Sequence, residues 1–176
     1  MDSLICRMIN NSKKYCDQLD ICCGFKKQHN YIGVDIDINS QADIIADLNK
    51  IWPFKDNTFN KIRAYDAIEH LINPIHIMNE IWRISKYNAE IDIFVPSTDG
   101  RGAFQDPTHV SYWNLNSFWY YVINNPILFK IGRSYGFKGC FTIKNKSDIY
   151  NEECEEFDVS GIIYTRVKMF AVKKRM

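Results

Sequence analysis

Short apolar segments separated by polar turns run through most of the chain, which is typical of an α/β fold. Residues 17–22, 31–36, 42–48, 61–65 and 89–96 each predict a strand. Apolar runs of four to eight residues bounded by turn formers are the usual pattern of buried strands. Because a helical pattern interrupts the series, we expect a mainly parallel central sheet.

The clearest helical pattern covers residues 74–86. Asn73 is a suitable N-cap, and Pro74 fits the first helical position, where its missing N–H costs nothing. The apolar positions recur at helical spacing. The predicted buried face consists of Ile75, Met78, Ile81 and Trp82.

The C-terminal part favours antiparallel strands. A polar loop at 97–109 leads into an aromatic segment at 111–122. Residues 139–145 and 160–173 then predict two strands, with the acidic stretch 152–158 between them. We expect these two strands to pair as a hairpin with a long connection.

Composition limits the class of protein. The 176 residues are 46% hydrophobic, and no linker or repeat divides them, so we expect one domain over residues 1–176. The net charge of +1 makes a nucleic-acid partner unlikely on electrostatic grounds. No apolar run approaches the roughly 20 residues of a membrane span. Six cysteines without a C-x-x-C pair, and no recognisable signal peptide, predict reduced thiols and a cytoplasmic location.

Polar residues gather where the predicted strands end. They are Asp20, Gly24, Asp35, Asp47 and Asp66. Open parallel sheets bind ligands beyond the carboxyl ends of their strands, so the same positions predict a binding site. The turn after the first strand has one glycine and lacks G-x-G-x-x-G, which makes a nicotinamide oxidoreductase a distant alternative.

The order of motifs resembles the class I S-adenosylmethionine-dependent methyltransferases. The motifs are LDICCG, GVDID, ADL with WPFKDNTFNKIRAYDAIEHL, NEIWRISK and IFVPS, followed by the D-P-T-H segment at 106–109. The match spans about residues 18–121. It is nearest to a methyltransferase type 11-like subgroup with a shortened first helix. The resemblance implies a Rossmann-like α/β domain that uses S-adenosylmethionine as its cofactor.

The resemblance also implies roles for residues at the strand ends. Asp20 would face the methionine part, Asp35 the ribose hydroxyls, and Asp47 the adenine amino group. Gly24 would let the backbone approach the ligand closely, and Asp66 would lie near the transferred methyl. The complete predicted cofactor-binding set is Asp20, Cys22, Gly24, Asp35, Ile36, Asp47, Leu48, Tyr65 and Asp66.

One departure from the family pattern concerns the glycine turn. The usual second glycine is missing, and Phe25, Lys26 and Lys27 follow Gly24 instead. Bulk or charge there would weaken cofactor binding, or Lys26 would contact the cofactor carboxylate. The departure supports one alternative function, a non-catalytic binding subunit with a methyltransferase-like fold. Cys22 and Cys23 are interpreted as small packing groups rather than nucleophiles.

The candidate catalytic residues are His109, Asp106 and His70. Transfer of a methyl group to a hydroxyl needs a base, and histidine has a suitable pKa that a nearby aspartate can support. We therefore hypothesise that His109, helped by Asp106, is the general base. The alternative is that Asp106 and His109 only fix the loop, and His70 has the same two interpretations. The three side chains are also a two-histidine, one-carboxylate set, but their loose spacing leads us to predict no metal.

The predicted acceptor is a small molecule or glycan, methylated on oxygen or nitrogen. A nucleic-acid methyltransferase stays as an alternative, although no N-P-P-Y or D-P-P-Y motif is present. The aromatic residues of 112–121 form either a wall over the acceptor or, more often at helical spacing, core or a homodimer interface. Glu80, Arg83 and Lys86 are interpreted as a surface pair and a helix end that complements the dipole.

Overall fold

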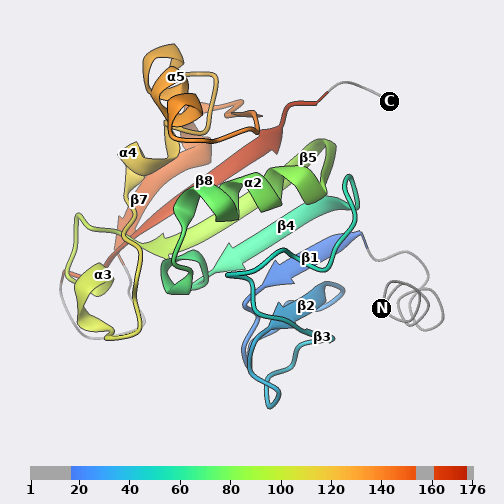
Figure 1. The fold of residues 1–176 in the computed structure, drawn as a ribbon. Helices are drawn as coiled ribbons and strands as arrows, with labels where there is room; N and C mark the ends of the chain where they lie inside the picture. The colour runs from blue at the N-terminus through green and yellow to red at the C-terminus, as the bar shows by residue number, and fades with distance from the viewer. Residues whose placement is uncertain (1–16, 154–160, 174–176) are drawn as a thin grey trace.

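A computed structural model describes residues 17–153 and 161–173, which form one eight-stranded sheet with helices beside it (Figure 1). The strands are β1 (Gln18–Ile21), β2 (Ile32–Asp35), β3 (Ile44–Ile45), β4 (Phe59–Tyr65), β5 (Ser85–Pro96), β6 (Phe141–Thr142), β7 (Ile149–Glu153) and β8 (Ile163–Ala171). The helices are α2 (Pro74–Ile84), α3 (Gly102–Gln105), α4 (Leu115–Phe118) and α5 (Pro126–Ser134), with 3₁₀ turns η1 (Ile68–His70) and η2 (Lys146–Asp148).

The strand order is β3-β2-β1-β4-β5-β8-β6, with β7 also paired to β8. Strands β1 to β5 pair in parallel, whereas β8 runs antiparallel to its neighbours β5, β6 and β7. The predicted α/β class, with a largely parallel sheet and an antiparallel C-terminal end, is confirmed. The chain moves outward from β1 to β3 and then returns to the other side of β1. The gap between β1 and β4 is therefore the topological switch point, where such sheets bind ligands.

Helix α2 covers one face of the sheet (Figure 1). Asn73 caps it by accepting a hydrogen bond from the His76 amide, and Pro74 occupies its first turn, as predicted. Its buried side chains join the strand residues in one apolar core. The buried face of α2 includes Ile77 and Ile84, which the prediction left out. Ile77, Met78, Ile81 and Ile84 are fully buried, whereas Ile75 and Trp82 are only partly buried.

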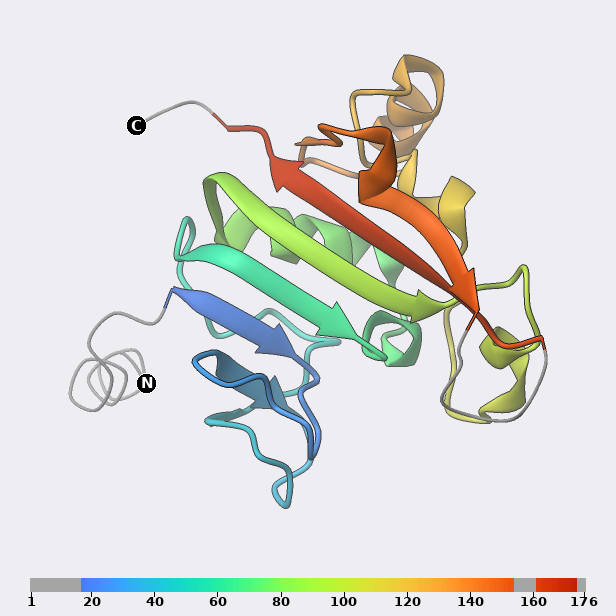
Figure 2. The same cartoon turned by 180° about the vertical axis from the view of Figure 1, so that it is seen from behind.

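The opposite face carries no helix among residues 17–153 and 161–173 (Figure 2). Polar and aromatic side chains point to this side because strand residues alternate between the two faces. Arg166 pairs with Asp92 at 2.9 Å, and the Tyr65 hydroxyl donates to the same carboxylate at 2.9 Å. The Arg63 guanidinium lies 3.9 Å from the centre of the Tyr65 ring. Phe94 adds aromatic packing on this face, since its ring stacks on Tyr164 with the ring centres 4.2 Å apart. Charge pairs and aromatic contacts together hold this face.

The C-terminal prediction was partly wrong. Strands β6 and β8 pair antiparallel, as expected, but residues 149–153 form the additional strand β7 instead of a connection. Strand pairing explains this difference, because every residue of β7 pairs with a residue of β8. The rest of the acidic stretch, 154–160, lies outside the described residues. The short third strand was also overestimated, since only Ile44–Ile45 pair with β2.

The interpretation of Glu80 and Arg83 as a surface pair was wrong. Glu80 is only 8% exposed and holds Arg83 through two contacts of 2.7 Å. It also accepts a hydrogen bond from the Trp52 amide, and Arg83 donates to the carbonyl oxygens of Trp52 and Phe54. The pair therefore fastens the loop before β4 to helix α2.

The aromatic segment contributes mainly to the core. Trp113, Phe118 and Tyr121 are buried, and Trp113 stacks on Phe118 with ring centres 5.3 Å apart. Tyr112 is the exception, because it is half exposed and stacks on Phe104. Within the described residues, no helix has the length and apolar character needed to cross a membrane.

Candidate functional site

The turn after β1 is fixed to the end of β2 by Asp35. Its carboxylate accepts hydrogen bonds from the Gly24 amide at 2.8 Å and from the Asp37 amide at 2.9 Å. Both Gly24 and Cys22 have φ of +49°, a left-handed conformation that non-glycine residues rarely adopt. The turn is therefore strained at Cys22 and held by a charged side chain. Such strain is typical of ligand-binding turns.

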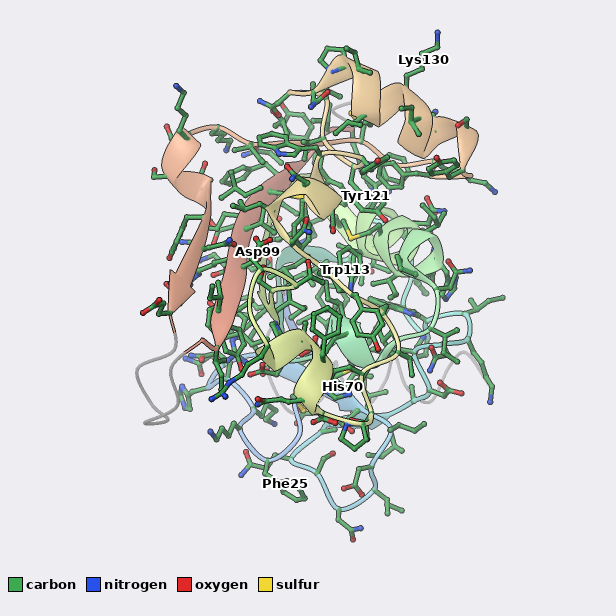
Figure 3. All side chains as sticks on the ribbon, turned by 90° about the vertical axis from the view of Figure 1, so that its left-hand side faces the viewer. Phe25, His70, Asp99, Trp113, Tyr121 and Lys130 are labelled. Atoms are coloured by element: carbon green, nitrogen blue, oxygen red, sulfur yellow. The ribbon has the colours of Figure 1, made fainter. Side chains whose placement is uncertain are left out.

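Two of the three bulky residues after Gly24, Phe25 and Lys27, are directed away from this turn. Phe25 is 66% exposed and projects outward from the molecule (Figure 3). The Lys27 ammonium pairs with Asp43 at 2.9 Å. A Cβ placed on Gly24 would meet no atom within 4 Å, so the space in front of the turn is open. Phe25 and Lys27 therefore leave the space in front of Gly24 open.

Asp20 is buried beneath the turn. It is 1% exposed, pairs with Arg63 at 2.8 Å and accepts a hydrogen bond from the Gln28 amide at 2.8 Å. Cys22 lies between the acidic groups of the site. Burial, and then the charges of Asp35 and Glu69, raise the pKa of its thiol far above the ordinary value. Cys22 is thus a neutral group packed against the apolar core.

The predicted adenine side lies beyond β2 and β3. Ile36 is 67% exposed immediately after Asp35 and offers an apolar surface at the rim. Asp47 accepts a hydrogen bond from the Asn49 amide at 3.0 Å, and this bond lowers the pKa of its carboxyl. The Leu48 side chain is buried, and its carbonyl oxygen accepts from the Trp52 indole at 2.9 Å. Asp47 and Ile36 therefore remain accessible, whereas Leu48 is almost completely buried.

The end of β4 brings Asp66 to the same edge. Asp66 has φ of +46°, the second strained non-glycine position beside the switch point. Burial raises the pKa of its carboxyl, and a hydrogen bond with Tyr164 and the charges of His70, His109 and Lys26 oppose this. Tyr65, the preceding residue, instead projects to the helix-free face, where burial and Asp92 raise its pKa to about 12.

A cavity of about 310 Å³ opens beyond the carboxyl ends of β4 and β5. It is lined by Asp66, Glu69, His70, Pro96, Gly102, Gln105, Asp106, His109, Ile162 and Tyr164. The three candidate catalytic residues therefore share one cavity with Asp66. The arrowheads of these strands and the loop carrying α3 meet at this edge in Figure 1.

The D-P-T-H loop is fastened to η1 through backbone hydrogen bonds. The Glu69 carbonyl oxygen accepts from the amides of Val110 and Ser111, at 2.8 and 3.0 Å. The Ser111 hydroxyl donates to the Ile68 carbonyl oxygen at 2.9 Å. These bonds place His109 next to η1, and the His70 and His109 ring centres are 5.0 Å apart. Figure 3 shows His70 beside the loop that carries α3.

Each histidine uses its Nδ1 atom to hold its ring. Nδ1 of His109 lies 3.0 Å from the Ala103 carbonyl oxygen. Nδ1 of His70 lies 3.3 Å from the Thr108 carbonyl oxygen and 3.1 Å from the Thr108 hydroxyl. Asp106 does not contact His109 through its side chain. It accepts from the Thr108 amide at 2.8 Å and the Thr108 hydroxyl at 2.6 Å, and the bonds to Thr108 lower the pKa of its carboxyl.

Glu69 is the carboxylate that faces His109, and the sequence reasoning missed it as a site residue. It is 2% exposed, and its Oε1 atom lies 4.0 Å from Nε2 of His109. Neither carboxylate oxygen accepts a hydrogen bond of normal geometry from a described residue. Burial raises the pKa of Glu69 to about 8, partly opposed by the backbone amides of Glu69 and Ala67. The signal was present in the sequence as the acid directly before His70.

Similar solved structures cover almost the whole chain. A SAM-dependent methyltransferase from Methanosarcina mazei is 14% identical, with a TM-score of 0.62, over 95% of this chain and 98% of its own. One from Archaeoglobus fulgidus is 18% identical, with a TM-score of 0.58, over 96% and 92% of the two chains. This chain has the fold of the S-adenosylmethionine-dependent methyltransferases. At these identities the likeness establishes the fold alone.

Two further comparisons concern longer proteins. Phosphoethanolamine N-methyltransferase 2 of Haemonchus contortus, solved with S-adenosyl-L-methionine, has a TM-score of 0.55 and 15% identity. It is matched over 99% of this chain and 52% of its own. An uncharacterized protein of Methanocaldococcus jannaschii is 32% identical over 110 residues, which are 55% of this chain. The methyltransferase-fold chain spans about half the length of this curated relative. No family model matches the chain.

Proposed function

We propose that this protein transfers a methyl group from S-adenosylmethionine to an oxygen or nitrogen atom of a small molecule or glycan. The observation that carries the proposal is that the glycine turn and the cavity lie at the same edge of the sheet, next to the switch point. The Asp35-bound glycine turn follows β1, and the cavity that contains Asp66, His70 and His109 lies beyond the neighbouring strand β4. The methyltransferase-fold neighbours support the proposal, and one of them is solved with S-adenosyl-L-methionine.

The cofactor would lie across the ends of β1, β2 and β4. Asp35 has two further acceptor positions on its oxygens beyond those used by the two amides, which suit the ribose hydroxyls. Exposed Ile36 would pack on adenine, and Asp47 with the Leu48 backbone would meet its polar edge. Gly24 would approach the methionine part. Asp20 would act from below, through the turn that it holds together with Arg63 and Gln28.

The open glycine turn favours catalysis over the non-catalytic alternative. That alternative rested on the missing second glycine. Phe25 faces outward and Lys27 is engaged by Asp43, so neither side chain occupies the place of the cofactor. Lys26 lies near enough to Asp66 to affect its pKa, and it is therefore a candidate partner for the cofactor carboxylate.

The acceptor would enter the cavity beyond β4 and β5. Its oxygen or nitrogen attacks the methyl carbon in line with the sulfur as the S–CH₃ bond breaks. The bonding electron pair stays on sulfur, which becomes neutral in S-adenosylhomocysteine, and the acceptor loses its proton. We assign activation of the acceptor to His109, whose Nε2 faces Glu69, with His70 beside it. Positioning of donor and acceptor supplies most of the rate enhancement.

The test is methyl transfer from radiolabelled S-adenosylmethionine to a panel of hydroxylated glycans and small amines. We expect labelled product with at least one acceptor, together with stoichiometric S-adenosylhomocysteine. His109→Ala should lower turnover about 100-fold or more and change cofactor affinity by less than threefold. Wild-type turnover in the His109→Ala protein would refute the role assigned to His109.

A further inference from the structure

We propose that Glu69, His70 and His109 bind a divalent transition-metal ion at the floor of the acceptor cavity. One ligand atom from each of the three side chains lies within 4.8 Å of the other two. A tetrahedral site with bonds of about 2.1 Å needs ligand atoms about 3.4 Å apart. The required closure is small, because one ligand atom from each side chain already lies within 4.8 Å of the other two. The metal site itself is inferred independently of the proposed function. Only the catalytic role of the ion rests on the proposed function.

The hydrogen bonds of the two histidines leave the correct nitrogen atoms available. A carbonyl oxygen only accepts, so the contact with Ala103 requires a proton on Nδ1 of His109. The contact with the Thr108 carbonyl oxygen requires the same tautomer of His70. Both rings then carry an unprotonated Nε2 with a free lone pair. An Nδ1–H donated to a backbone carbonyl is the usual second-shell bond of a metal-ligating histidine.

The Thr108 hydroxyl extends this second shell. It donates to Asp106 at 2.6 Å, so toward Nδ1 of His70 it acts as an acceptor. Asp106, which sequence reasoning placed next to His109, thus orients His70 through Thr108. This chain of contacts holds the His70 ring in place and gives the exposed Asp106 a structural role.

Glu69 supplies the independent observation that points to a cation. Its carboxylate is almost completely buried, lines the cavity, and accepts no hydrogen bond of normal geometry from the described residues. A buried carboxylate without partners is expensive, because burial removes the water that would solvate its charge. A bound divalent ion next to both oxygens would supply that missing partner. His109 offers no donor either, because its Nε2 atom, 4.0 Å from the carboxylate, carries no proton in this tautomer.

The ligand set predicts the kind of ion. Two imidazoles and one carboxylate suit Zn²⁺ and its first-row neighbours, and three protein ligands leave positions open toward the cavity. An acceptor hydroxyl bound there would have a lowered pKa and would release its proton to water before it attacks the methyl carbon. His109 would then activate the acceptor through the metal.

The experiment uses the full chain, freed of any histidine tag and stripped with a chelator. Zn²⁺ alone is titrated calorimetrically, and Co²⁺ binding is followed by its visible absorption, which reports imidazole and carboxylate ligands. We expect one ion per chain with micromolar or tighter affinity. Glu69→Gln and His109→Ala should each weaken binding at least 100-fold. His29→Ala, which removes an exposed histidine outside the cavity, is the matched control and should stay within twofold.

Two results would overturn the inference, provided that circular dichroism shows each protein to be folded. One is the absence of Zn²⁺ and Co²⁺ binding by the wild-type chain. The other is binding that Glu69→Gln and His109→Ala leave unchanged, which would mean a surface ion only. A separate titration with S-adenosylmethionine keeps the two proposals distinct. Metal binding without cofactor binding would contradict the proposed function alone, and cofactor binding without metal binding would contradict this inference alone.

Discussion

The Glu80→Gln substitution tests how the loop before β4 is held against helix α2. Glutamine has nearly the same shape as glutamate but no charge, and it presents an amide group where one carboxylate oxygen was. The two 2.7 Å contacts with Arg83 and the 2.9 Å bond from the Trp52 amide cannot all be kept. The substitution therefore weakens the joint between loop and helix without creating a cavity.

The expected cost follows from the burial of the pair. Hydrogen bonds to charged groups contribute about 1.5 to 3 kcal/mol each, and two of them are lost or weakened. Arg83 keeps the carbonyl oxygens of Trp52 and Phe54 and is 26% exposed, which reduces the loss. We therefore expect a decrease of about 2 to 3 kcal/mol in the free energy of unfolding. In urea, this should lower the unfolding midpoint by about 1 M.

The matched control is Asp56→Asn. Asp56 contacts the same arginine at 2.8 Å, but its side chain is 68% exposed, so its removal should cost less than about 0.5 kcal/mol. Equilibrium urea unfolding followed by circular dichroism measures both variants. Equal losses for Glu80→Gln and Asp56→Asn, or a loss below about 1 kcal/mol for Glu80→Gln, would refute the reasoning.

The pH dependence of the same variant gives an independent check. Burial pushes the pKa of Glu80 upward, but the hydrogen bonds from Arg83 and the Trp52 amide prevail and lower it below the ordinary value of 4.5. A lowered folded-state pKa means that Glu80 stabilises the fold above pH 4.5 and loses that contribution as the pH falls further. The stability difference between wild type and Glu80→Gln should therefore be full at pH 7 and shrink below pH 4.5.

Three more substitutions probe the turn, the buried ion pair and the C-terminal packing. Asp20→Asn should lower the free energy of unfolding by about 3 kcal/mol, because it leaves Arg63 without its buried partner; a urea midpoint equal to wild type would contradict this. Gly24→Ala should cost only about 1 kcal/mol, since the added Cβ meets no atom within 4 Å but the left-handed φ is unfavourable. Its affinity for S-adenosylmethionine, measured by calorimetry, should nevertheless fall at least tenfold, and an unchanged affinity would argue against a close approach of the cofactor. Gly132→Ala should lower the melting temperature by about 6 to 12 °C, because its Cβ would lie 2.1 Å from the Tyr120 carbonyl oxygen; a thermal melt that matches wild type would show that α5 packs differently.

The sequence predicted the parallel half of the fold well because local signals there are strong. The strand that ends at Asp35 is buried at every position, the strand that ends at Pro96 alternates buried and partly exposed residues, and Asn73 with Pro74 marks the start of α2. The same start signal, Asn125 with Pro126, follows the aromatic segment and precedes α5, a helix that the sequence reasoning did not predict. The missed helix therefore reflects an unused local signal.

Other errors came from contacts between distant segments. Nothing near Glu80 in sequence reveals that the Trp52 amide and the backbone of the 52–56 loop complete its surroundings. Strand β7 reads as a polar acidic stretch, and pairing with β8 along its whole length makes it a strand. Tertiary context overrides local propensity in both cases.

The candidate site was predicted as a set of strand ends but not in its detailed pairing. His70, Asp106 and His109 do line one cavity, as their positions after β4 and β5 indicated. The identity of the carboxylate facing His109 depends on the backbone bonds from Val110 and Ser111 to Glu69, which no sequence spacing encodes. The cofactor-binding set as a whole stays a prediction.

The most direct test of the proposed function is calorimetric titration of the purified protein with S-adenosylmethionine and, separately, with S-adenosylhomocysteine. We predict micromolar binding of both. Asp35→Asn should weaken it at least tenfold, while Asp37→Asn, the adjacent carboxylate, should leave it within twofold. The asparagine variant is preferred to alanine because the Asp35 side chain also holds the amides of Gly24 and Asp37. Failure of the folded wild-type protein to bind either ligand would contradict the account and restore the non-catalytic alternative.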